Sequence, residues 1–222
     1  MFNSNFSKKP LFYSSKLCVL IYYFVVYGIL APYYRLFFLA KSQGKENIPT
    51  EKSVIFAANH SSYHDPALLS ITARKHIAYM AKKELFAVPV LSPIIYHLGA
   101  FPVNREKLEL STIKTAKHIL GDSYWNLGIF PQGTRIFSGS LEDIKPGFGH
   151  LAKVTKSTVI PVYIDIQRGF LPFFGKAIVN FGEQLPASDD PDEICENWKA
   201  AIARLKGIPA RPEIQKNTSM PS

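Results

Sequence analysis

His60 and Asp65 could act together in proton transfer, and they lie five residues apart in a polar stretch that follows the largely apolar run 53–58. The run has the composition of a β-strand, and Pro66 favours the start of a helix. We expect Asp65 to be the N-cap residue of that helix, with Pro66 at its first position. A carboxylate bonded to one imidazole nitrogen leaves the other nitrogen to act as a base. The pattern therefore predicts a His–Asp dyad beyond the carboxyl end of a strand.

The same stretch also allows a metal site. His60 and His64 are four residues apart, with Asp65 adjacent, and this spacing suits zinc when both histidines share one helical face. Because Pro66 follows almost at once, we expect the pair to straddle a turn, and no convincing third ligand cluster stands out in the sequence. A metal hydrolase remains an alternative, but we expect no metal and no other cofactor.

Arginines follow two other strand-like segments. One segment ends in Arg105, and the other runs directly into the stretch 130–135, which contains Gly133, Thr134 and Arg135. Arginine binds phosphate oxygens in a bidentate way, and glycine lets backbone amides approach a ligand closely. These residues predict a phosphate-binding group at the same edge of the sheet as the dyad.

The N-terminal part is apolar and rich in tyrosine. Residues 17–34 contain no charged residue and include five tyrosines, and Pro32 interrupts the run near its end. Such a run is borderline in length for a bilayer span, and tyrosine prefers the headgroup boundary. Between a single span and a kinked pair of helices lying half-buried in one leaflet, we favour the pair. The formal charge of +9 also favours an anionic membrane surface or a phosphate-bearing substrate.

Strand-like and helix-like segments alternate over the rest of the chain. This alternation predicts an α/β domain with a mixed, mostly parallel sheet flanked by helices. We expect a membrane anchor over 1–41, a polar linker over 41–52, one domain over 53–206 and a flexible tail over 207–222. Expected strands are 53–58, 77–80, 100–103, 127–130, 158–164 and 177–181, and expected helices begin at Pro66 and cover 82–87, 89–98, 108–120 (closed by Gly121) and 190–205.

Four blocks in this order resemble the motifs of the glycerolipid acyltransferase family, and of the 1-acylglycerol-3-phosphate acyltransferases in particular. The blocks are Asn59–His60 with Asp65, Gly99 to Arg105, Phe130 to Arg135, and Val159 to Val162. The resemblance covers roughly 53–186. It implies an αβ domain behind an N-terminal membrane-associated helical segment, which agrees with residues 17–40.

The resemblance also implies a mechanism. His60 would be the general base that deprotonates the acceptor's hydroxyl, and Asp65 would hold the imidazole in the right tautomer. The hydroxyl would attack the thioester of acyl-CoA or acyl carrier protein directly, without an acyl-enzyme or a metal. The residues that would bind substrate are Asn59, Arg105, Gln132, Gly133, Thr134 and Arg135.

The chain departs from the family at one position, because Gln132 stands where the family usually has glutamate. Glutamine keeps one carbonyl acceptor but loses the charge. The expected acceptor is 1-acylglycerol 3-phosphate, with another lysophospholipid or glycerol 3-phosphate as alternatives, and a non-catalytic membrane-surface protein as an alternative from another class. We expect membrane lipids but no nucleic acid as partners, since no nucleic-acid-binding motif is recognisable. The expected location is a bacterial inner membrane, or an internal membrane in a eukaryote, with the site facing the cytoplasm.

Overall fold

A computed structural model describes residues 12–13, 15–50, 52–104, 108–122, 124–136, 144–169 and 174–208. In these residues the strands form one seven-stranded sheet with the order β1-β7-β6-β2-β5-β3-β4. The strands are β1 (Lys41–Gln43), β2 (Ile55–Ala58), β3 (Ile77–Lys82), β4 (Phe101–Val103), β5 (Asn126–Ile129), β6 (Val159–Arg168) and β7 (Gly175–Phe181).

Five neighbouring strands, β6, β2, β5, β3 and β4, run parallel, while β7 is antiparallel to β6 and β1 runs parallel to β7. All four residues of β2 and of β5 are buried. Both strands are short apolar runs because a parallel sheet is covered on its two faces. The prediction of a mixed, mostly parallel sheet is confirmed.

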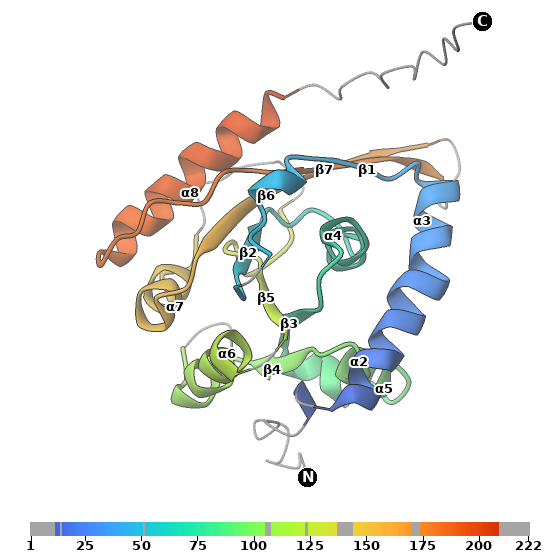
Figure 1. The fold of residues 1–222 in the computed structure, drawn as a ribbon, viewed down its shortest axis with the longest axis horizontal. Helices are drawn as coiled ribbons and strands as arrows, with labels where there is room; N and C mark the ends of the chain where they lie inside the picture. The colour runs from blue at the N-terminus through green and yellow to red at the C-terminus, as the bar shows by residue number, and fades with distance from the viewer. Residues whose placement is uncertain are drawn as a thin grey trace, which may run out of the picture.

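Helices cover both faces of the sheet (Figure 1). The helical elements are α2 (Lys16–Tyr23), η2 (Phe24–Leu30), α3 (Ala31–Phe37), η3 (Lys45–Asn47), α4 (Asp65–Ala73), η4 (Lys83–Ala87), α5 (Leu91–His97), α6 (Leu110–Asp122), α7 (Gly147–Thr155) and α8 (Pro191–Lys206). Helices α6, α7 and α8 lie on one side, and α4 lies on the other, between the sheet and α3. On α8, the indole of buried Trp198 donates a hydrogen bond to the carbonyl oxygen of Ala57 at 2.9 Å. This bond fixes α8 to β2 three residues before His60.

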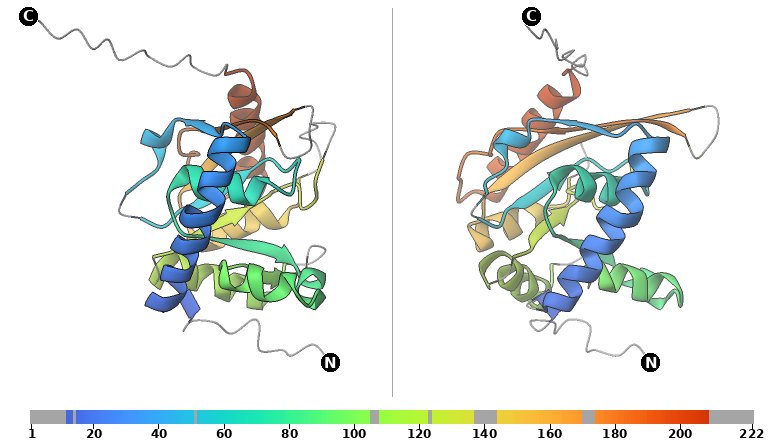
Figure 2. Two further views of the ribbon diagram at one scale, coloured as in Figure 1. Left: turned by 90° about the vertical axis from the view of Figure 1, so that its right-hand side faces the viewer. Right: turned by 45° about the vertical axis from the view of Figure 1, so that its right-hand side comes forward.

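The N-terminal apolar segment is one continuous helix of 22 residues, Lys16–Phe37, long and apolar enough to cross a membrane. It runs along one side of the domain (Figure 2). The helix continues through Pro32, which lies at the start of α3 directly after the π-helical η2, so the segment is not divided into two separate helices. The prediction of two kinked helices is therefore wrong.

Three tyrosines of this helix differ from the expectation that they sit at the headgroup boundary, whereas Tyr23 is exposed. Tyr22 and Tyr34 are buried against the domain, and the hydroxyls of Tyr22, Tyr27 and Tyr34 reach hydrogen-bond partners there. The opposite face is apolar and exposed, with Leu20 and Leu36 at 65% and 70%. One face of the helix thus belongs to the core of the domain, and the other faces outward.

Three local expectations are corrected. The polar stretch 41–52 is more than a linker, because its first residues form β1, which pairs with β7 at the sheet edge. Gly121 lies inside α6 rather than closing it. Asp65 is the first residue of α4 and His64 is the N-cap, because the Asp65 carboxylate turns back toward the preceding loop instead of capping the helix.

Candidate active site

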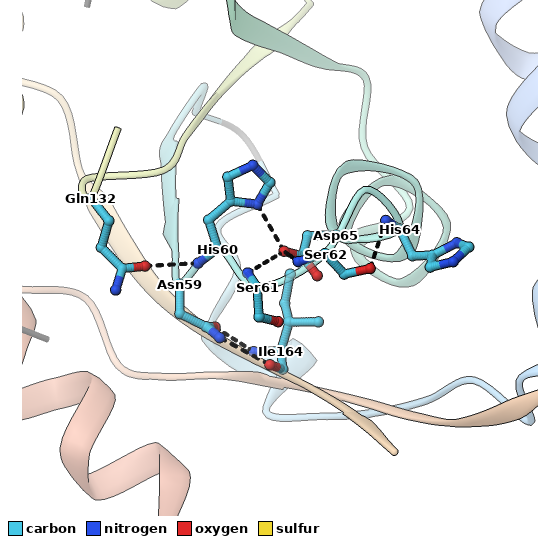
Figure 3. Close-up of polar contacts among 8 residues, drawn as sticks. All are labelled: Asn59, His60, Ser61, Ser62, His64, Asp65, Gln132 and Ile164. Atoms are coloured by element: carbon cyan, nitrogen blue, oxygen red, sulfur yellow. Dashed lines mark hydrogen bonds and ion pairs between the residues drawn. The ribbon is translucent and has the colours of Figure 1, made fainter. Parts of the chain in front are cut away.

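The predicted dyad is formed. Nδ1 of His60 lies 2.8 Å from Oδ2 of Asp65 (Figure 3). The same oxygen accepts hydrogen bonds from the backbone N–H groups of Ser61 at 2.7 Å and Ser62 at 2.8 Å. Three donors thus converge on one carboxylate oxygen of a residue that is 0% exposed. They fix the carboxylate in place, and an imidazole that donates through Nδ1 has Nε2 as its proton-accepting atom.

The imidazole ring of His60 is held on its face as well. It stacks on Phe130, with ring centroids 4.1 Å apart and planes inclined by 22°. Behind Phe130 lies Tyr79, whose hydroxyl donates to the carbonyl oxygen of Pro66 at 2.8 Å. Burial is the largest cause that raises the pKa of Tyr79 well above its usual value, so this hydroxyl keeps its proton for the bond. Tyr79 on β3 therefore lies behind the ring that stacks on His60 and also bonds the residue that follows Asp65.

Two predicted substrate-binding residues position the backbone around His60. The side chain of Gln132 is buried, and its Oε1 accepts a hydrogen bond from the backbone N–H of His60 at 2.9 Å. The amide of Asn59 makes two bonds to the backbone of Ile164, donating to its oxygen at 3.0 Å and accepting from its nitrogen at 2.7 Å. Asn59 thereby extends the contact between β2 and β6 past the end of the strand, so its contacts are those of a bridge between strands rather than of a substrate ligand.

Three of the remaining predicted residues, Gly133, Thr134 and Arg135, follow one another in the turn after β5. Gly133 has a φ of +67° and lies against Lys145, so a Cβ here would stand 2.9 Å from Cγ of that lysine. Thr134 is exposed. The guanidinium carbon of Arg135 lies 3.5 Å from the centroid of the Tyr63 ring. Arg105 lies outside the described residues.

A cavity of about 320 Å³ opens beside His60. Its lining is mostly apolar but includes a lysine and a second histidine. The lining residues include Met80, Val103, Leu108, Ile129, Phe130, Pro131 and Phe148, together with Asn104, Gly133, Lys145 and His150. Among the predicted substrate-binding residues that the structure describes, Gly133 lines this cavity, whereas Thr134 and Arg135 do not. The cavity has the size and apolar character of a pocket for a small ligand or part of a larger one.

The model of the acyltransferase family matches residues 40–165, more than half of the chain. The chain belongs to the acyltransferase family. The matched region begins at the edge strand β1 and includes β2 with the dyad, β5 with Gln132 and most of β6.

Similar proteins agree with this assignment. A 1-acyl-sn-glycerol-3-phosphate acyltransferase of Bacillus subtilis is 33% identical over 67% of this chain and 75% of its own length. The enzyme of that name from Streptococcus pneumoniae is 34% identical over 65% of this chain but only 54% of its own length. The crystal structure of PlsC, the 1-acyl-sn-glycerophosphate acyltransferase of Thermotoga maritima, has the same fold, with a TM-score of 0.64, 21% identity, and coverage of 90% of this chain and 87% of that one.

The position of Gln132, which replaces the glutamate usual in the family, shows what this side chain does in the structure. The bond from the His60 N–H to Gln132 requires one carbonyl-type oxygen, which both side chains possess. The substitution therefore preserves the hydrogen bond that holds the backbone of the dyad.

Sequence reasoning missed several residues around the dyad. Phe130 belongs to a recognised motif block, but its stacking on His60 was not predicted, because that contact depends on β2 and β5 lying side by side in the sheet. Lys145 follows residues that carry no motif. His64 has its imidazole directed away from His60, toward the N-terminal helix (Figure 3). The two histidines of the turn therefore do not present their rings to a common ligand.

Proposed function

We propose that this protein transfers a fatty acyl group from a thioester donor to the sn-2 hydroxyl of 1-acylglycerol 3-phosphate, which yields phosphatidic acid. The observation that carries the proposal is the His60–Asp65 bond beside an apolar cavity in a member of the acyltransferase family. The names of the similar bacterial proteins support the choice of acceptor.

The reaction needs a base and a carbonyl electrophile. Nε2 of His60 removes the proton of the acceptor hydroxyl as its oxygen attacks the thioester carbonyl, while Asp65 holds the imidazole through Nδ1. Collapse of the tetrahedral intermediate expels the thiolate, which takes up a proton, so an ester and a free thiol result. In this mechanism the apolar cavity accommodates an acyl chain.

The acceptor phosphate is assigned to the side of the turn after β5. Arg105, Gly133, Thr134 and Arg135 are the proposed phosphate-binding residues, because arginine binds phosphate oxygens in a bidentate way and the threonine hydroxyl can donate to them. The N–H of Gly133 donates to the carbonyl oxygen of Phe130 at 2.8 Å, so glycine here contributes close approach of the backbone to the ligand. Lys145 adds a cation that lies against Gly133 in the lining of the cavity. We keep Asn59 and Gln132 in the site as residues that position His60.

We further propose that the helix Lys16–Phe37 lies on the cytoplasmic surface of a membrane with its exposed face in the lipid. The inner face supports this reading, because Tyr22, Val26 and Tyr34 pack in the domain and would be stripped from it in a span. The outer face is apolar and is bracketed by Lys16 and exposed Arg35. A surface position brings the active site close to lipid acceptors.

The experiment is an acceptor and donor panel with the purified protein in vesicles. Acyl-CoA and acyl carrier protein thioesters are each offered with lysophosphatidic acid, with a lysophospholipid whose phosphate carries a headgroup, and with glycerol 3-phosphate. The proposal predicts the highest kcat/KM for lysophosphatidic acid. A preference for either other acceptor would overturn the choice of acceptor, and absence of thioester-dependent acylation with all of them would overturn the reaction.

A further inference from the structure

The dyad turn is bonded to the N-terminal helix through a second histidine. The hydroxyl oxygen of Tyr34 on α3 lies 2.8 Å from Nδ1 of His64. The His64 ring also packs against Tyr34 edge-on, with centroids 5.7 Å apart, and against Phe38 at 4.8 Å. Tyr34 and Phe38 are 5% and 1% exposed. Burial raises the pKa of Tyr34 to about 12, so its hydroxyl keeps the proton that it can donate to the imidazole.

This contact continues into the dyad through short, specific bonds. The backbone N–H of His64 donates to Oγ of Ser62 at 3.2 Å, and the backbone N–H of Ser62 donates to Oδ2 of Asp65 at 2.8 Å. That oxygen is the one that bonds Nδ1 of His60. His64 also precedes Asp65 in the chain and is the N-cap of α4. A shift of His64 would therefore move the carboxylate that orients the base.

We propose that Tyr34 and His64 are positioning residues, which hold the turn so that the His60–Asp65 pair keeps its reactive geometry. The inference rests on the proposed acyl transfer. It adds Tyr34, which lies outside the motif blocks, and His64, which is one of the four residues between His60 and Asp65. It makes the apolar helix a part of the catalytic framework as well as a membrane contact, because the helix residue that binds His64 is followed directly by outward-facing Arg35 and Leu36.

Other tyrosines of the same helix provide the internal comparison. The hydroxyl of Tyr27 donates to the carbonyl oxygen of Ser70 at 3.4 Å, and that of Tyr22 to the carbonyl oxygen of Lys75 at 3.2 Å. Both bonds attach the N-terminal helix to the domain, but their acceptors lie away from the dyad turn. Ser70 is in the second half of α4, and Lys75 follows the end of α4. The hydroxyl of Tyr34, by contrast, meets the turn that carries the dyad.

The test compares Tyr34→Phe with Tyr27→Phe. Each variant removes one hydroxyl and keeps the ring, so the packing of the helix is preserved. We expect Tyr34→Phe to lower kcat about tenfold with little change in KM, since a small misplacement of a catalytic base reduces turnover without affecting substrate binding. Tyr27→Phe should stay within about twofold of the wild type in both constants. Thermal unfolding and vesicle sedimentation of both variants show whether folding and membrane binding are retained.

A double-mutant cycle then locates the effect in the Tyr34–His64 contact. His64→Phe keeps a ring between Tyr34 and Phe38 and removes the nitrogen, and it should lower kcat to a similar degree. The double variant should be no slower than the slower single variant, because each substitution removes the same Tyr34–His64 hydrogen bond. Independent effects would instead multiply to about a hundredfold.

The inference is overturned if Tyr34→Phe turns over like Tyr27→Phe, if the two single effects multiply in the double variant, or if the loss matches the unfolded fraction. These outcomes differ from failure of the proposed function, which would leave the wild type itself without acyl transfer in the same assay.

Discussion

The turns after β2 and β5 lie side by side at one end of the sheet, yet they are built differently. The first turn is held by hydrogen bonds within itself. The fully buried carboxylate of Asp65 accepts from the N–H groups of Ser61 and Ser62 and from the His60 imidazole. In the second turn the side chain of Gln132 is buried, but that of Thr134, two residues later, is exposed to solvent. Under the proposed mechanism the first turn holds the geometry for proton transfer, and the second turn contacts the acceptor. We therefore expect substitutions in the second turn to change substrate preference while the chemistry of the first turn is kept.

The largest effect is expected in the first turn. Asp65→Asn keeps the size of the side chain but replaces an oxygen that accepts three hydrogen bonds with a group that can favour the wrong imidazole tautomer. We expect kcat to fall on the order of 10³- to 10⁴-fold, as for the aspartate of other His–Asp pairs. Steady-state kinetics measure this, with Asp189→Asn as a control at an exposed carboxylate. Activity of Asp65→Asn near that of the control would show that the turn does not need its carboxylate.

Gln132 joins the two turns and should give an intermediate effect. Gln132→Met removes the acceptor for the partly buried N–H of His60, which costs about 1 kcal/mol of stability, and we expect kcat to fall about tenfold. Gln132→Glu keeps an acceptor oxygen and should retain kcat within about threefold. Kinetics and thermal unfolding of both variants check this. Equal activity of Gln132→Met and the wild type would show that the hydrogen bond between the two turns is not needed for catalysis.

The second turn alone should give the smallest effect, and in a different constant. Gly133→Ala places a Cβ at a φ of +67° and 2.9 Å from Cγ of Lys145, which strains the backbone by about 1 kcal/mol and displaces the lysine. We expect KM for the acceptor to rise a fewfold and kcat to stay near the wild-type value. An acceptor titration measures both. A fall in kcat with unchanged KM would contradict the division of roles between the turns.

The same contrast explains how far the sequence alone predicts the site. The first turn could be predicted because its partners are close in the chain, with His60 and Asp65 five residues apart and Pro66 marking the start of the helix. The link between the turns joins residues 72 apart, and the Tyr34–His64 contact joins residues 30 apart. Such pairs depend on how strands and helices pack, which no local pattern encodes.

The strands β2 to β7 were predictable for a related reason, since short buried runs bounded by turn residues such as Gly99 are local signals. The polar edge strand β1 carries no such signal, and its composition predicts a linker instead. The N-terminal helix was only partly predictable. A tyrosine-rich apolar run is typical of a membrane interface, but burial of Tyr22 and Tyr34 against the domain produces the same composition. Membrane and protein core both favour apolar residues, so composition does not distinguish the face that packs from the face that is exposed.

His60 is the proposed base for acyl transfer, and every other assigned role depends on it. The most direct measurement compares wild type and His60→Ala for thioester-dependent acylation of lysophosphatidic acid, in vesicles and at equal amounts of folded protein. The account predicts readily detected phosphatidic acid with the wild type and a rate lower by about 10² to 10⁴ with the variant. Comparable rates for the two proteins would contradict it.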